Sequence, residues 1–335
     1  MSNKAIASVD TPDPWIIAAN GLFYFTFTLA NRIEIWSSPE LENFFHPQKT
    51  VAWQPEKGAP WSTDIWAPEL HFIDGNWYIY ATATNPGKGL ASHRTIVLRS
   101  SHQDPMEKSG WQFLGPVKGM PDAYSIDATV FSLNGRDQYL CWSGWPPGDN
   151  SDTQQNLYVA QMVSPEEVVS ESILPPLCIS KPDLPWERFE NDKRGINEGP
   201  TWLRLPSNVF TGIVYSGHAS FTSEYKLGLL ALVSTDADPL DPKSWVKRQV
   251  PLLMNDKSMP GPYAPGHASF LTSPTPGDAR VFCIYHATEK WGEGFGNRKA
   301  RVLALEPHMF HANAQPVCCS NGSQNPLFQG HPTRG

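Results

Sequence analysis

The chain of 335 residues has no hydrophobic run long enough to cross a membrane. A membrane-spanning helix needs about 18 or more consecutive apolar residues, and no segment approaches that length. The first ten residues, MSNKAIASVD, also lack the apolar core of a secretory signal. We therefore expect no membrane partner. We expect a cytoplasmic location for the chain as it stands, or secretion if a leader is missing from it.

Basic clusters and metal-binding cysteine motifs are absent as well. The formal net charge is −7 and no stretch is rich in Lys and Arg, so nucleic acid and anionic lipid are excluded as expected partners. The five cysteines show no metal-ligand spacing. No segment has a sustained period of 3.6 residues, so the sequence predicts no long amphipathic helix.

What the sequence does contain is one strand–turn–strand pattern repeated five times. Each copy has an apolar strand, a turn rich in Gly, Asn, Pro or Ser, and a second strand rich in aromatic and β-branched residues. The residues that lead the copies are Asp13, Glu69, Asp127, Glu198 and His267, which stand 56 to 71 positions apart. A recurring unit of this size, made of short strands, predicts an all-β fold, a five-bladed β-propeller.

The repeat covers nearly the whole chain, which predicts a single propeller domain over residues 1–335. The expected blades are roughly 10–62, 63–122, 123–192, 193–260 and 261–320. The innermost strand of each blade lines the channel of a propeller, so we expect the four leading carboxylates and the leading histidine to meet there. Long polar loops near 85–93, 146–155 and 181–195 are expected at the channel mouth, and the tail after residue 320 on the outside.

Acidic residues facing one channel are costly unless something uses them. Cleavage of a glycosidic bond needs a carboxylic acid to protonate the leaving oxygen and a carboxylate to activate water or attack carbon. A third carboxylate nearby raises the pKa of the acid by like-charge repulsion. Asp13, Asp127 and Glu198 stand at corresponding places in three repeats and can supply these groups.

Six segments, in this order and spacing, resemble glycoside hydrolase family 43. They are TPDPW at 11–15, WAPELH at 66–71, SIDATVF at 125–131, NEGP at 197–200, YAPGHASF at 263–270 and NRKAR at 297–301. Members of this family are five-bladed propellers that act on arabinose- and xylose-containing polysaccharides and invert the anomeric configuration. The resemblance implies that Asp13 is the general base, Asp127 the pKa modulator and Glu198 the general acid.

The resemblance also implies residues that bind the substrate or an ion. Arg298 matches an arginine that contacts the innermost sugar, and Arg301 is a second candidate on the same segment. Trp66 is a candidate for stacking on a sugar ring, with packing between blades as the alternative. His267 matches a histidine at the propeller centre, where a Ca²⁺ ion or a water cluster is expected; a hydrogen-bonded histidine without metal is the alternative.

The function that these residues predict is an inverting glycoside hydrolase that releases terminal α-L-arabinofuranose from arabinan or arabinoxylan. The alternatives are a β-xylosidase or an endo-arabinanase on the same scaffold and, from a different class, a propeller that binds carbohydrate without cleaving it. Asp10 is the alternative general base. Glu69, the fourth acid, is expected to tie blades together rather than to act in catalysis.

Overall fold

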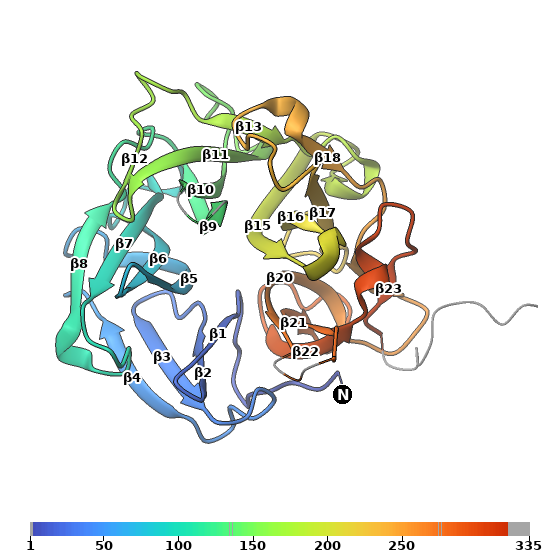
Figure 1. The fold of residues 1–335 in the computed structure, drawn as a ribbon, viewed down its shortest axis with the longest axis horizontal. Helices are drawn as coiled ribbons and strands as arrows, with labels where there is room; N and C mark the ends of the chain where they lie inside the picture. Colours follow the sequence, from blue (N-terminus) through green and yellow to red (C-terminus); the bar gives the residue numbers. More distant parts are fainter. Residues whose placement is uncertain (1–2, 134, 136, 274, 276, 321–335) are drawn as a thin grey trace, which may run out of the picture.

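The structure is a computed structural model that describes residues 3–133, 135, 137–273, 275 and 277–320. Its strands form five groups around a central axis, with β1, β5, β9, β15 and β20 innermost (Figure 1). The prediction of an all-β propeller is therefore confirmed. No helix among the described residues is long or apolar enough to span a membrane.

The first two blades are separate four-stranded antiparallel sheets, ordered from the centre outward. Blade I consists of β1 (Trp15–Ala19), β2 (Leu22–Thr26), β3 (Ile33–Ser38) and β4 (Gln48–Trp53). Blade II consists of β5 (Thr63–Ile73), β6 (Asn76–Thr84), β7 (Arg94–Ser100) and β8 (Trp111–Pro116). In both blades a turn with a positive-φ glycine, Gly21 at 75° and Gly75 at 81°, joins the first two strands, because glycine adopts that conformation without strain.

The third and fourth blades are linked by two residue pairs between parallel strands, Gln154 with Gly195 and Gln155 with Ile196. Blade III consists of β9 (Ser125–Leu133), β10 (Asp137–Gly144), β11 (Gln154–Ser164), β12 (Glu167–Val168) and β13 (Leu177–Ser180). Blade IV contains β15 (Arg194–Arg204), β16 (Thr211–Gly217), β17 (Lys226–Leu232), β18 (Trp245–Lys247) and β19 (Leu253–Met254). Blade V contains β20 (Tyr263–Thr272), β21 (Val281–Thr288) and β22 (Lys299–Leu305).

Two short strands belong to a different blade from the one that the repeat predicts. β14 (Arg188–Phe189) pairs with β15, and β23 (Val317–Cys318) pairs with β19, so both extend blade IV. The predicted boundaries put them in the third and fifth blades. Short edge pairings depend on contacts far along the chain, which a repeat in the sequence does not reveal. The predicted tail after residue 320 lies outside the described residues.

Blade V is completed by the N-terminal segment, which lies beside its outer strand (Figure 1). Ala5 forms an antiparallel bridge with Arg301, and the Ile6 N–H donates to the Ala300 carbonyl at 3.0 Å. Thr11 N–H donates to the Arg298 carbonyl at 2.8 Å. The first and last blades are thereby joined, which closes the ring.

The hydrophobic core lies between neighbouring blades. One cluster joins Ile16 and Phe25 of blade I to Phe282 and Ile284 of blade V. Others join blade I to blade II and blade III to blade IV in the same way. Six short 3₁₀ helices lie in the connections of the described residues, at Leu90–Ser92, Lys108–Gly110, Pro185–Glu187, Pro206–Asn208, Pro242–Ser244 and Pro307–Phe310.

Candidate active site

Four innermost strands carry a β-bulge where they face the channel: β5, β9, β15 and β20. At each bulge one residue has a positive φ, namely Ala67 (44°), Asp127 (56°), Gly199 (54°) and His267 (43°). Asp13 adopts a φ of 57° directly before β1. A bulge breaks the alternation of a strand and redirects a side chain. Non-glycine residues rarely adopt this conformation, and those that do cluster at functional sites.

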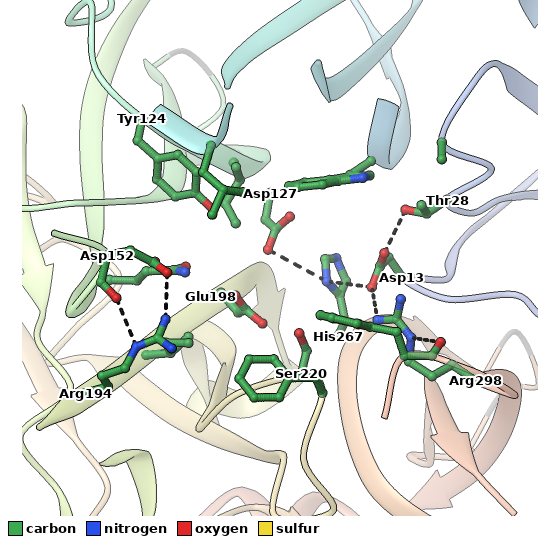
Figure 2. A pocket seen from close by; sticks show the side chains of 18 residues that line it. Asp13, Thr28, Tyr124, Asp127, Asp152, Arg194, Glu198, Ser220, His267 and Arg298 are labelled. Atoms are coloured by element: carbon green, nitrogen blue, oxygen red, sulfur yellow. Dashed lines mark hydrogen bonds and ion pairs between the residues drawn. The ribbon is translucent and has the colours of Figure 1, made fainter. Parts of the chain in front are cut away.

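Of these residues, Asp13, Asp127 and His267 line a cavity of about 430 Å³ (Figure 2). Six of the predicted site residues line it: Asp13, Trp66, Asp127, Glu198, His267 and Arg298. The three loops expected at the mouth also contribute lining residues, with Leu90 from the first, Asp152 from the second and Arg194 from the third. The motifs and the loops of the sequence therefore predict most of the groups that meet in this cavity.

Glu69 does not join this cavity, which corrects the expectation that all five leading residues meet. The bulge in β5 falls at Ala67, so Glu69 lies past it, buried against Thr129 and His71. His71 Nε2 lies 2.8 Å from Glu69 Oε2. Burial raises the pKa of Glu69 well above its usual value and lowers the pKa of His71 to about 3, so burial favours the uncharged form of each group.

Arg301 is also absent from the cavity, and its assignment to the substrate is wrong. It is buried in β22 opposite Tyr285, and its guanidinium contacts the Asn3 carbonyl at 2.6 Å and the Glu289 carboxylate. Arg298 lies just before β22, whereas Arg301 lies within this strand and faces the blade interior. Asp10, the alternative base, is exposed and accepts a hydrogen bond from the Asn297 N–H at 3.0 Å.

Asp13 is held in its ionised form. Burial alone would raise its pKa, but His267, Arg298, His286 and the Thr28 hydroxyl together lower it to about 2. Thr28 Oγ1 donates to Asp13 Oδ2 at 2.7 Å, and Arg298 Nη1 lies 3.6 Å from Oδ1 (Figure 2). Burial lowers the pKa of both histidines, so the charge that favours the Asp13 carboxylate at neutral pH is that of Arg298.

Glu198 and Asp127 are both pushed toward the protonated form. Burial raises the pKa of Glu198 to about 7; hydrogen bonds from Tyr225 and Ser220 oppose this shift, and the charge of Asp13 adds to it. Burial raises the pKa of Asp127 well above its usual value, and the charges of Glu198 and Asp13 act in the same direction. Two buried carboxyl groups this close cannot both ionise readily, so they retain a proton near neutral pH.

Trp66 and Arg298 border the same cavity from different blades. The Trp66 ring stacks on His93, with centroids 4.2 Å apart and planes 20° apart, so one ring face is already covered. The Arg298 Nε donates to the Phe295 carbonyl at 3.2 Å, which holds its guanidinium near Asp13. Both residues line the cavity that also contains Asp13 and Glu198.

His267 contacts the acids rather than a set of metal ligands. Its Nδ1 lies 3.4 Å from Asp13 Oδ1 and 3.9 Å from Asp127 Oδ2 (Figure 2). Among the described residues, no three His, Cys, Asp or Glu side chains are grouped so that they could hold a metal ion. Calcium prefers six to eight oxygen ligands. The side chains around His267 therefore do not fit an ion bound directly by protein carboxylates.

Three contacts that the motifs do not reveal position Asp13 and Glu198. Thr28 holds Asp13, and the Asp13 N–H donates to His286 Nδ1 at 3.0 Å. Tyr225 donates its hydroxyl hydrogen to Glu198 Oε1 at 2.9 Å. The Tyr225 and His286 rings stack with centroids 5.7 Å apart, so one ring pair supports both acids. Strand alternation places such residues on a face but does not identify their partners.

The chain belongs to glycosyl hydrolases family 43, whose family model matches residues 2–316. An "Alpha-L-arabinofuranosidase 43" of Humicola insolens is 33% identical over 264 residues, which are 78% of this chain and 51% of that protein. An "Extracellular exo-alpha-(1->5)-L-arabinofuranosidase" of Streptomyces chartreusis is 31% identical over 272 residues, 81% of this chain and 77% of that protein. The chain thus spans about half the length of the first relative.

Solved structures agree with this assignment. An α-L-arabinofuranosidase from Lactobacillus brevis has a TM-score of 0.76 and 29% sequence identity, over 88% of this chain and 90% of that chain. A thermostable family-43 glycoside hydrolase has a TM-score of 0.70 and 22% identity, over 88% and 89% of the two chains, and this likeness shows the fold alone.

Proposed function

We propose that this protein is an inverting exo-α-L-arabinofuranosidase in which Asp13 is the general base, Glu198 the general acid and Asp127 the modulator of the acid. The observation that carries the proposal is the opposite ionisation of two acids in one cavity. The pKa of Asp13 is held at about 2 while that of Glu198 is raised to about 7. Two carboxyl groups whose pKa values differ in this way can supply a base and an acid at the same pH.

Each group then performs one part of the hydrolysis. The Asp13 carboxylate removes a proton from a water molecule, and that water attacks the anomeric carbon of the terminal sugar. Glu198 gives its proton to the oxygen of the leaving sugar as the glycosidic bond breaks. Because Tyr225 donates to Glu198 Oε1, that oxygen is an acceptor and the acid proton is carried on Oε2. Arg298 and Trp66 hold the terminal sugar.

Arabinofuranose is the favoured substrate because relatives that are 31–33% identical to this chain carry that activity in their names. The name of the Streptomyces chartreusis protein specifies exo action on α-1,5 linkages outside the cell, and the loops around the cavity mouth are consistent with recognition of a chain end. A β-xylosidase or an endo-arabinanase would use the same three acids, and a carbohydrate-binding propeller would need none of them.

An assay with 4-nitrophenyl α-L-arabinofuranoside and 4-nitrophenyl β-D-xyloside tests the proposal. We expect hydrolysis of the first at a kcat/KM well above that of the second. Asp13→Asn and Glu198→Gln should each lower kcat by about 10²–10⁴-fold without unfolding the protein. Exposed Asp10→Asn is the matched control and should retain activity. Wild-type rates in Asp13→Asn, or preference for the xyloside, would contradict the proposal.

Inversion is tested separately by following the product anomer with NMR. Attack by water gives β-L-arabinofuranose first, before mutarotation. Inverting pairs hold their carboxyl groups about 6.5–9.5 Å apart, which leaves room for that water. Initial appearance of the α-anomer, or transfer of arabinose to added methanol, would show a covalent intermediate.

A Ca²⁺ ion on the propeller axis near His267 stays a separate proposal, and the donor set around His267 does not favour it. Such an ion would be held mainly by water and carbonyl oxygens. Dialysis against EDTA should then lower the melting temperature, and added Ca²⁺ should restore it. An unchanged melting temperature would mean that His267 acts without an ion.

A further inference from the structure

Two phenylalanine side chains border the cavity and are exposed to solvent. Phe221 is 40% exposed and Phe295 is 61% exposed, although both line the cavity that contains the acids. Their ring centroids are 5.6 Å apart, so the two rings form one continuous apolar surface. Exposed aromatic side chains gathered at a pocket mark a binding surface.

The surface is held in place by contacts between two loops. Phe221 lies in the loop between β16 and β17, and Phe295 lies in the loop between β21 and β22. The Gly292 N–H of the second loop donates to Ser223 Oγ of the first at 2.7 Å. The Phe295 carbonyl accepts a hydrogen bond from Arg298 Nε. A preorganised surface binds a ligand without first losing loop entropy.

The surface adjoins the acid that faces the leaving group. Ser220, the residue before Phe221, lies close enough to the Glu198 carboxyl to favour its ionised form and lines the same cavity. Figure 2 shows Ser220 and Glu198 beside one another in the cavity. The proton of Glu198 goes to the oxygen of the departing sugar, so that sugar lies on the Glu198 side and within reach of Phe221.

The cavity is also larger than one sugar ring requires. A water molecule occupies roughly 30 Å³ in the liquid. If each of the about ten non-hydrogen atoms of a pentose is given that volume, the sugar fills only about 300 Å³. The cavity holds about 430 Å³. Part of a second sugar therefore fits inside, and its apolar C–H face can cover the aromatic surface.

From these observations, and resting on the proposed function, we propose that Phe221 and Phe295 form the binding surface for the sugar on the leaving-group side of the cleaved bond. The enzyme then prefers arabinofuranose oligosaccharides, in which a second furanose covers these rings, over arabinofuranosides with a small leaving group. Phe221 is the better probe because Phe295 also lies under the Arg298 guanidinium, at 5.3 Å.

The experiment compares kcat/KM on α-1,5-arabinobiose and on methyl α-L-arabinofuranoside for wild type and three variants. For Phe221→Ala, we expect the ratio of the first value to the second to fall roughly three- to tenfold. Phe221→Tyr retains an aromatic face and should keep the wild-type ratio. Phe45→Ala removes a similarly exposed phenylalanine, 46% exposed and away from the cavity, and should leave both values unchanged.

The outcomes separate this inference from the function on which it rests. If the wild type cleaves both substrates and Phe221→Ala keeps the wild-type ratio of kcat/KM values, the proposed role of the aromatic surface is overturned and the proposed function is not. Equal losses on both substrates in Phe221→Ala also overturn it, because the side chain would then act on the catalytic centre. A wild type that cleaves neither substrate overturns the proposed function, and the inference with it.

Discussion

At the scale of single residues, this site consists of carboxyl groups whose ionisation is set by a few neighbours. Arg298 and Thr28 favour the Asp13 carboxylate, and burial favours the protonated form of Glu198. The motifs identified the three acids, because their order and spacing are visible in the sequence. Thr28, Tyr225 and His286 could not be identified in the same way. They come from strands and loops whose contacts with the acids exist only after the blades assemble.

Asp127→Asn is expected to narrow the pH range of activity at its alkaline side. As the proposed general acid, Glu198 must be protonated to act, so activity should fall as the pH passes the pKa of Glu198. When Asp127 carries the charge of this coupled pair, it repels a charge on Glu198, so Asn at this position removes that repulsion and lets Glu198 ionise earlier. The alkaline limb of kcat should move down by about one pH unit. A pH–rate profile on the arabinofuranoside measures it, and an unchanged or upward-shifted limb would refute the role of Asp127.

Tyr225→Phe should move the same limb in the opposite direction. The Tyr225 hydroxyl donates to Glu198 at 2.9 Å and thereby stabilises the carboxylate form. Without it the pKa of Glu198 rises, and the alkaline limb should move up by about one pH unit. Tyr80→Phe, which removes another buried tyrosine hydroxyl in blade II, is the control and should leave the profile unchanged. A lower rate with an unshifted profile would mean that Tyr225 only packs.

At the scale of the strand, the bulges decide which residues reach the cavity. The period-2 pattern predicts strands well, and the expected second strands of the blades are present. It does not show where a strand gains an extra residue. For this reason the repeat predicts Glu69 at the centre, whereas the bulge of β5 leaves it beneath the cavity and buried. In β15 the bulge residue is Gly199, which places Glu198 just before it.

Gly199→Ala is expected to lower both stability and turnover. Gly199 has a φ of 54°, and a Cβ there would stand 3.1 Å from the His267 ring. The backbone strain should lower the free energy of unfolding by about 1–2 kcal/mol, as urea denaturation would show. Displacement of the His267 ring should lower kcat as well. A shift of the Gly199 N–H, which donates to Asp127 at 3.0 Å, should act in the same direction.

Gly75→Ala is the matched control for this substitution. Gly75 has a φ of 81° in a turn of blade II, and a Cβ there meets nothing within 4 Å. It should lose stability to a similar degree while keeping wild-type kcat. If both variants kept full activity, the bulge at Gly199 would not position the acids.

At the scale of the whole molecule, both the propeller ring and the site depend on the contact between blades I and V. Asp13 comes from blade I, whereas Arg298, His267 and His286 come from blade V, so the environment of the base is assembled where the ends of the repeat meet. The repeat in the sequence predicted the propeller. It did not predict that residues 5 and 6 complete blade V, because that segment has no strand pattern and pairs with β22 near the other end of the chain.

Ile6→Ala should therefore weaken both the packing that joins blades I and V and the surroundings of Asp13. Ile6 is 2% exposed and packs in the cluster between blades I and V. Truncation of a buried isoleucine costs about 2–5 kcal/mol, so the melting temperature should fall clearly. Val9→Ala, in the same segment but 48% exposed, should change little. Because Asp13 follows this segment, hydrolysis of the arabinofuranoside by Ile6→Ala, if the proposed function holds, should be lost on warming no later than global structure measured by circular dichroism. Activity that outlasted the folded signal, or an unchanged melting temperature, would mean that the N-terminal segment covers the ring without closing it.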